Sequence, residues 1–87
     1  MTGVRWLSLR KSIEASERPR APIVQIAISK RVAPQADRRN RMKRLIREAL
    51  RRKIKLEQGG VYRIQIHRYP ADPDYALVES ALVETFK

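Results

Sequence analysis

The stretch from Asp37 to Lys53, DRRNRMKRLIREALRRK, combines a dense basic run with apolar residues at helical spacing. These apolar residues recur every three or four positions and so share one face of an α-helix: Met42, Leu45, Ile46, Ala49 and Leu50. The far side of the same helix carries Asn40, Lys43, Arg44, Arg47 and Arg51. The pattern predicts a helix from about Pro34 or Gln35 to about Leu56 that packs through its apolar face and exposes cations. Within it, Glu48 and Arg52 form a favourable i,i+4 pair.

Three other segments alternate apolar and polar side chains with a period of two, which is typical of strands with one buried face. They are Val4–Lys11, Ile23–Lys30 and Val61–Tyr69, and the first two are joined by a polar loop over residues 12–22. The predicted order is therefore β-β-α-β-α. This is an α+β fold, in a single domain over residues 1–87, with both helices on one face of the sheet.

The ends of the two helices carry recognisable signals. Gln58–Gly60 is expected to end the basic helix, because glycine takes the left-handed conformation at little cost. Asp72 is expected to cap the last helix, with Pro73 in its first turn and Asp74 beside its positive end. That last helix is expected to bury Tyr75, Val78, Ala81, Leu82 and Phe86.

The second face of the predicted sheet is polar and basic. It carries Trp6, Ser8, Arg10, Gln25, Ser29, Arg63, Gln65 and His67. Two interpretations stay open at this point: the face is either simply hydrated or a second binding surface.

The net charge of +11 indicates a polyanionic partner. Residues 1–68 hold nineteen basic and five acidic side chains, a local net charge of +14, and such dense like charge weakens a fold unless a partner neutralises it. Nucleic acid is the first candidate and an anionic membrane surface the second. From Asp37 to Lys53 arginine outnumbers lysine seven to two, which favours phosphate, since the guanidinium fork grips phosphate with two hydrogen bonds. These features do not separate RNA from DNA.

Catalysis on this chain is poorly supported. It has no cysteine, one histidine, no glycine-rich phosphate loop and no metal-ligand spacing, so no catalytic residue and no metal site is predicted. We interpret His67 as solvated or structurally bonded, and Asp72 and Asp74 as capping residues. No apolar run reaches the length of a membrane span or of a signal-peptide core, so a cytoplasmic protein is expected.

The stretch Ser29–Arg52 resembles the signature of the protein component of bacterial ribonuclease P. The resemblance lies in residue types and spacing: Ser29-Lys30-Arg31, Arg39-Asn40-Arg41, Lys43-Arg44, Leu45-Ile46 and Arg47-Glu48. It implies the fold of the second domain of ribosomal protein S5, with a left-handed β-α-β crossover. It also implies an accessory subunit that binds the catalytic RNA and precursor tRNA and assists removal of the 5′ leader. The catalytic groups and the Mg²⁺ ions would then lie on the RNA, with no cofactor on the protein, no membrane and no protein partner.

Site residues follow from the resemblance position by position. The expected RNA-binding residues are Lys30, Arg31, Arg38, Arg39, Asn40, Arg41, Lys43, Arg44 and Arg47. The candidates for contact with the leader are Trp6, Arg10, Gln25, Arg63 and His67. For Asn40 a bond to the helix backbone is the alternative, and for Trp6 it is packing at the edge of the core. Family members usually begin with a further helix that lines the leader cleft. This chain is expected to lack it, which puts leader binding in doubt and leaves RNA docking unaffected.

Two other functions remain as alternatives to the ribonuclease P subunit. One is a ribosomal-type structural RNA-binding protein or RNA chaperone that uses the same basic helix. The other is a DNA-binding regulator, although no second helix precedes the basic one at helix-turn-helix spacing.

Overall fold

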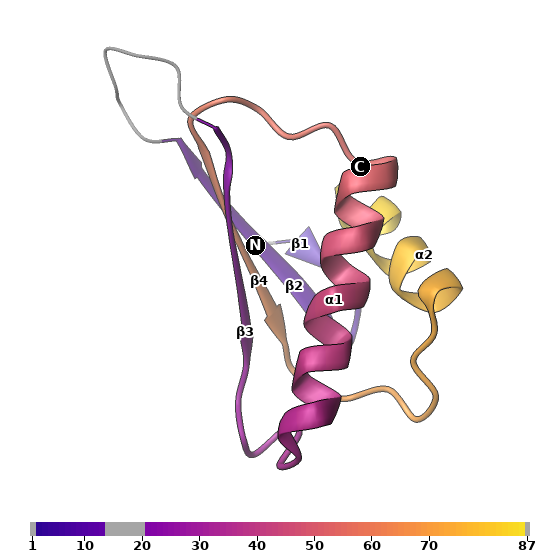
Figure 1. Ribbon diagram of the computed structural model, residues 1–87. Coiled ribbons are helices and arrows are strands. Elements are labelled where there is room, and N and C mark those ends of the chain that lie inside the picture. Colours follow the sequence, from indigo (N-terminus) through magenta and orange to yellow (C-terminus); the bar gives the residue numbers. More distant parts are fainter. Residues whose placement is uncertain (1, 14–20, 87) are drawn as a thin grey trace.

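The computed structural model describes residues 2–13 and 21–86. In chain order its elements are β1 (Thr2–Gly3), β2 (Leu7–Ile13), β3 (Ile23–Ile28), α1 (Ala36–Lys53), β4 (Gly60–Ile66) and α2 (Tyr75–Thr85), as Figure 1 shows. The predicted α+β class and the order β-β-α-β-α are confirmed, and the very short β1 is an addition. The predicted loop over residues 12–22 lies partly outside the described residues, and its first two residues belong to β2.

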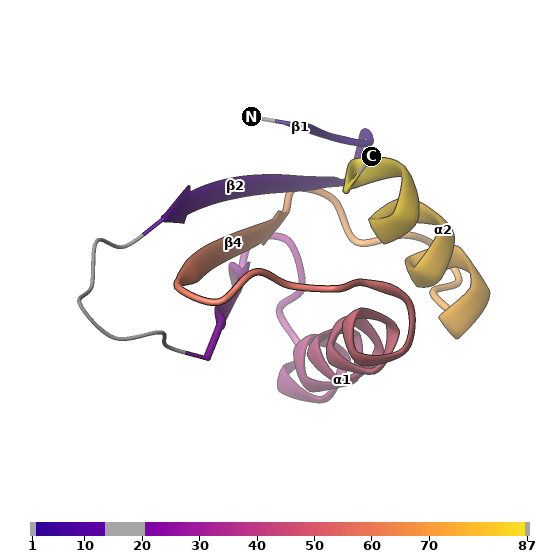
Figure 2. The ribbon, with the colours of Figure 1, turned by 90° about the horizontal axis from the view of Figure 1, so that it is seen from above.

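The sheet has the strand order β1-β2-β4-β3 and is mixed. Strand β2 runs antiparallel to β4, with Leu9 opposite Ile64, whereas β3 runs parallel to β4, with Ile26 opposite Ile64. Two parallel neighbours need a crossover, and α1 provides it. Figures 1 and 2 together show that this crossover is left-handed, against the right-handed sense of nearly all such connections. The handedness implied by the family resemblance is therefore confirmed.

One face of the sheet is buried under the two helices, which lie on the same side of it in Figure 2. The alternation in β2 and β4 places Leu7, Leu9, Tyr62, Ile64 and Ile66 in the core. The side chains between them, such as Arg63 and Gln65, are exposed on the opposite face. The alternation in β3 has the same phase, because Val24, Ile26 and Ile28 pack against the core. The predicted two-faced sheet is confirmed.

The predicted bounds of the basic helix were too wide. Helix α1 begins at Ala36, so Pro34 lies outside its first turn, and it ends at Lys53 because Ile54 has extended backbone (φ −119°, ψ 131°). Ile54 and Leu56 pack against the core from this extended segment, and their burial there competes with continued helix. Gly59, with φ of 77°, shapes the turn into β4 and does not end the helix.

The predicted cap of the last helix was wrong by two residues. Asp74 is the N-cap of α2, and its Oδ1 accepts a hydrogen bond from the Leu77 N–H at 2.9 Å. Asp72 lies in the irregular segment before the helix and is exposed. Helix α2 buries Val78, Ala81, Leu82 and Thr85, whereas Tyr75 and Phe86 are only half-buried against the core.

Candidate nucleic-acid interface

Helix α1 divides into a buried face and a charged face as the sequence predicts. Met42, Ile46, Ala49 and Leu50 are buried, and Leu45 packs against them at the edge of the core. Across the helix, Arg44 and Arg47 are exposed. The same helix therefore anchors the fold and presents cations to solvent.

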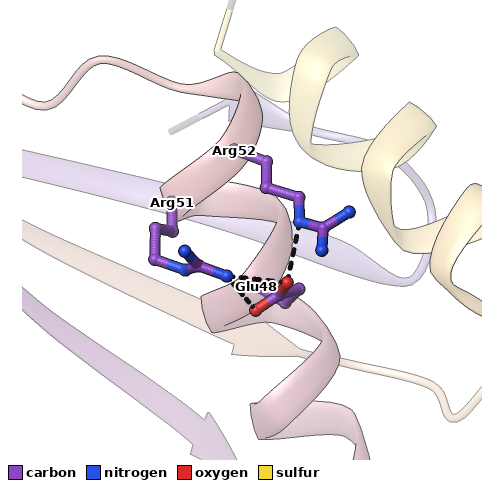
Figure 3. Close-up of polar contacts among 3 residues, drawn as sticks. All are labelled: Glu48, Arg51 and Arg52. Carbon is purple, nitrogen blue, oxygen red and sulfur yellow. Dashed lines mark hydrogen bonds and ion pairs between the residues drawn. The ribbon is translucent and has the colours of Figure 1, made fainter.

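Three charges near the C-terminal end of α1 pair within the helix (Figure 3). Glu48 accepts from Arg51 Nη2 at 2.8 Å and from Arg52 Nε at 2.7 Å, so the predicted Glu48–Arg52 pair is confirmed and Arg51 joins it. The hydrogen bond from Arg51 holds the pKa of the Glu48 carboxyl below its ordinary value, and the same contact raises the pKa of Arg51. The Arg52 guanidinium also lies 5.7 Å from the centre of the Tyr75 ring. The two arginines at this end of the helix therefore already contact other groups of the protein.

Three arginines near the N-terminal end of α1 are bound to neighbouring loops. Arg39 Nη1 donates to the carbonyl oxygens of Ala33 and Pro34, at 2.7 and 2.9 Å. Arg41 Nη2 donates to the carbonyl of Pro73 at 3.3 Å. The Arg38 guanidinium lies 5.9 Å from the Tyr69 ring, and the Tyr69 hydroxyl donates to the Arg38 carbonyl. These three predicted RNA-binding residues therefore also connect α1 to the segments on either side of it.

The other polar residues of this face form a patch that we call the α1 arc, defined as Asn40, Lys43, Arg44 and Arg47. Within the described part of the chain, none of these side chains has a hydrogen-bond or ion-pair partner. Lys43 is half-buried and the other three are exposed. Because these side chains bond only to water in the free protein, they can bind phosphate groups without breaking any protein contact.

The turn between β3 and α1 adds two exposed cations, Lys30 and Arg31. Its backbone is closed by Ser29, whose carbonyl accepts from the N–H groups of Val32 at 3.1 Å and Ala33 at 3.0 Å. The Ser29 hydroxyl accepts a further bond from the Val32 N–H at 3.2 Å. The ordered backbone places both predicted cations at the approach to the helix.

The open face of the sheet contains a groove of about 350 Å³, the sheet groove, which is lined mainly by Ser8, Arg10, Gln25, Ala27, Arg63 and Gln65. Arg10 and Arg63 lie directly opposite each other on β2 and β4. Like charges at such positions destabilise a sheet, although Arg63 Nε is stabilised by a bond to Gln25 Oε1 at 3.1 Å. Arg10, Gln25 and Arg63, three of the five leader candidates, are brought together here.

His67 and Trp6, the other two leader candidates, do not line that groove themselves. The His67 Nε2 and the Ser8 Oγ are 2.6 Å apart, which gives the histidine a structural bond. His67 also lines an adjoining groove with Ser29, Lys43 and Gln65, so the sheet groove continues toward α1. Trp6 is half-buried and packs against the core, in line with its alternative role. Strand alternation in the sequence identifies the polar face, but only the structure shows which of its residues line each groove.

The described residues contain no group of three or more His, Cys, Asp or Glu side chains that could hold a metal ion. Nor does any helix in that part of the chain have the length and apolar character needed to cross a membrane. The chemistry that the described surface offers is the binding of anions by guanidinium and ammonium groups, beside amides that can bond to bases.

Comparison with known proteins gives a family for the chain. The family model for ribonuclease P matches residues 5–87, which includes every strand and helix except β1. No curated protein and no solved structure shows a significant match. The matched range spans the α1 arc, the turn before it and the sheet groove. The chain therefore belongs to the ribonuclease P protein family.

Proposed function

We propose that this chain is the protein subunit of a bacterial ribonuclease P, which binds the catalytic RNA and assists removal of the 5′ leader from precursor tRNA. One observation carries the proposal beyond the family. The α1 arc has one sign of charge and no protein partner within the described residues, although Arg51 and Arg52 nearby are paired with Glu48. An unpaired cationic surface on a rigid helix fits a structured polyanion.

The roles of the residues follow from their chemistry. Arg44 and Arg47 contact phosphate groups with their guanidinium forks, and Lys43 adds a point charge. Asn40 reaches a base edge or a ribose 2′-hydroxyl, and the 2′-hydroxyl is the group by which a protein distinguishes RNA from DNA. The catalytic groups and the Mg²⁺ ions belong to the RNA subunit, so this chain contributes binding and orientation only.

The sheet groove is the proposed site for the single-stranded leader. Arg10 and Arg63 provide two facing cations for the backbone, and Gln25 and Gln65 provide amides for base edges. Trp6 is a weaker candidate for base stacking because it packs against the core.

The test is cleavage of precursor tRNA by a bacterial ribonuclease P RNA at low Mg²⁺ concentration, with and without this chain. We expect the chain to stimulate cleavage, and the double variant Arg44→Ala/Arg47→Ala to lose most of that stimulation. The control variant Lys53→Ala/Lys55→Ala removes the same charge outside the α1 arc and should stimulate nearly as well as the unmodified chain.

Each alternative function gives a different result in the same experiment. Tight RNA binding without stimulation would favour a ribosomal-type RNA-binding protein or an RNA chaperone. Preference for duplex DNA over structured RNA would favour a DNA-binding regulator. Equal losses in both double variants would mean that only total charge matters, which would contradict the assignment of the α1 arc.

A further inference from the structure

We infer that Arg39 is a positioning residue, which orients Lys30 and Arg31 toward the RNA instead of binding the RNA itself. This inference rests on the proposed function, because that function identifies ribonuclease P RNA as the partner used in the test. The first arginine of the Arg-Asn-Arg motif would then hold a turn in place, whereas the residues of the α1 arc contact the RNA.

Helical geometry places the three residues of the motif in different directions. Successive residues of an α-helix diverge by about 100°, so Arg39, Asn40 and Arg41 cannot all face one surface. Asn40 projects onto the arc with Arg44 and Arg47. Arg39 then points back toward the turn before the helix, where its guanidinium meets the carbonyls of Ala33 and Pro34.

Arg39 ties the preceding segment to α1 at a helix end that has no side-chain cap. The N-cap residue, Gln35, makes no side-chain capping bond. A cation within the first turns of a helix is unfavourable beside the positive end of the helix dipole, so Arg39 needs a compensating contact. Two charge-assisted hydrogen bonds to carbonyls, at 2.7 and 2.9 Å, provide it.

Those two carbonyls belong to the same short segment that carries Lys30 and Arg31. Ala33, only 2% exposed, is held from one side by its N–H bond to Ser29 and from the other by Arg39. Lys30 and Arg31 lie between these fixed points and are themselves exposed. Without Arg39, the turn loses two hydrogen bonds to α1, its bonds to Ser29 open more often, and the two cations lose their fixed orientation.

A double-mutant cycle tests this directly. The affinity for a bacterial ribonuclease P RNA is measured by fluorescence anisotropy for the unmodified chain, Arg39→Ala, Lys30→Ala/Arg31→Ala and the triple variant. We expect Arg39→Ala alone to weaken binding by at least about threefold, and to have almost no further effect when Lys30 and Arg31 are already absent. Arg44→Ala is the matched control, and its loss should persist in full in the Lys30→Ala/Arg31→Ala background.

A direct phosphate contact by Arg39 would give the opposite pattern. Its loss would then add to that of Lys30 and Arg31 and lower the salt slope by about one further unit, and the inference would be overturned. An unchanged affinity in Arg39→Ala would overturn it equally. If the unmodified chain does not bind ribonuclease P RNA, the proposed function fails. The cycle is then measured on a structured RNA that the chain does bind. An effect of Arg39→Ala that vanishes without Lys30 and Arg31 supports the inference, and an additive effect overturns it.

Amide exchange gives a readout that does not depend on RNA. The Val32 and Ala33 N–H groups should exchange faster in Arg39→Ala than in the unmodified chain or in Arg44→Ala, because the turn opens more often. Unchanged exchange at both amides would show that Arg39 does not hold the turn.

Discussion

At the scale of single residues, Glu48 determines how many cations of α1 are available to a partner. Its carboxylate accepts from both Arg51 and Arg52, and the bond from Arg51 lowers its pKa. A carboxyl whose pKa is lower in the folded chain than in the unfolded chain stabilises the fold above its unfolded pKa. That stabilisation disappears as the pH falls through the folded pKa. The pair therefore acts at neutral pH and is lost in acid.

Replacing Glu48 by Gln tests this residue. The variant should have a slightly lower free energy of unfolding than the unmodified chain at pH 7, since ion pairs that are exposed to solvent contribute little to stability. The difference should vanish in acid, below the lowered pKa of Glu48. Chemical unfolding over a series of pH values measures it, and a difference that is independent of pH would mean that the pair does not contribute. The same variant frees Arg51 and Arg52, so it should bind RNA more tightly.

At the scale of elements, Asp74 fixes the start of α2. Asp74→Ala removes the acceptor for the Leu77 N–H and should lower the free energy of unfolding by about 1 kcal/mol, as is typical for a lost N-cap. Asp72→Ala is the matched control and should leave stability nearly unchanged, because Asp72 lies outside the helix. Thermal unfolding compares the two variants. An equal or larger loss in Asp72→Ala would contradict the observed cap.

The elements also show how far the sequence predicts this fold. Alternation in Ile23–Ile28 and Gly60–Ile66 predicts both faces of the sheet, because residues two apart must share a face. The wheel of α1 likewise predicts its buried stripe. The start of α2 could not be predicted, because Asp72 and Asp74 satisfy the same local rule. The end of α1 could not be predicted either, because burial of the extended Ile54 and Leu56 is a tertiary effect.

The sequence likewise predicts some residues of the candidate site and not others. Charge and helical spacing identify the α1 arc without any structure. They cannot distinguish Arg39 or Arg41 from the arc, because the acceptors of these arginines are backbone carbonyls of Ala33, Pro34 and Pro73. Backbone carbonyls are present at every residue and give no signal in the sequence. Only the folded positions of the two loops show which arginines are already occupied.

At the scale of the whole molecule, charge is separated along the chain. Residues 1–68 have a net charge of +14, and residues 69–87, with one basic and four acidic side chains, have a net charge of −3. Part of the acidic segment lies beside the C-terminal end of α1, where Glu79 lies 3.9 Å from the Lys53 ammonium. Together with Glu48, it neutralises part of the positive charge at that end of the helix. The unpaired cations of α1, which are Lys43, Arg44 and Arg47, therefore lie in the middle of the helix, and the turn before it adds Lys30 and Arg31.

This separation predicts how strongly salt weakens RNA binding. Five cations without protein partners in the described part of the chain face this surface: Lys30, Arg31, Lys43, Arg44 and Arg47. If each neutralises one phosphate, log K plotted against log salt concentration should have a slope of about −4, at roughly −0.7 to −0.9 per contact. Titrations of a ribonuclease P RNA by fluorescence anisotropy at several salt concentrations measure the slope. Arg44→Ala/Arg47→Ala should make it less steep by about two units, and Glu48→Gln should make it steeper because Arg51 and Arg52 become available. A flat response would contradict the cationic surface. A slope of about −8 to −10, which corresponds to neutralising the full net charge of +11, would mean that RNA contacts the whole molecule and not one face of α1.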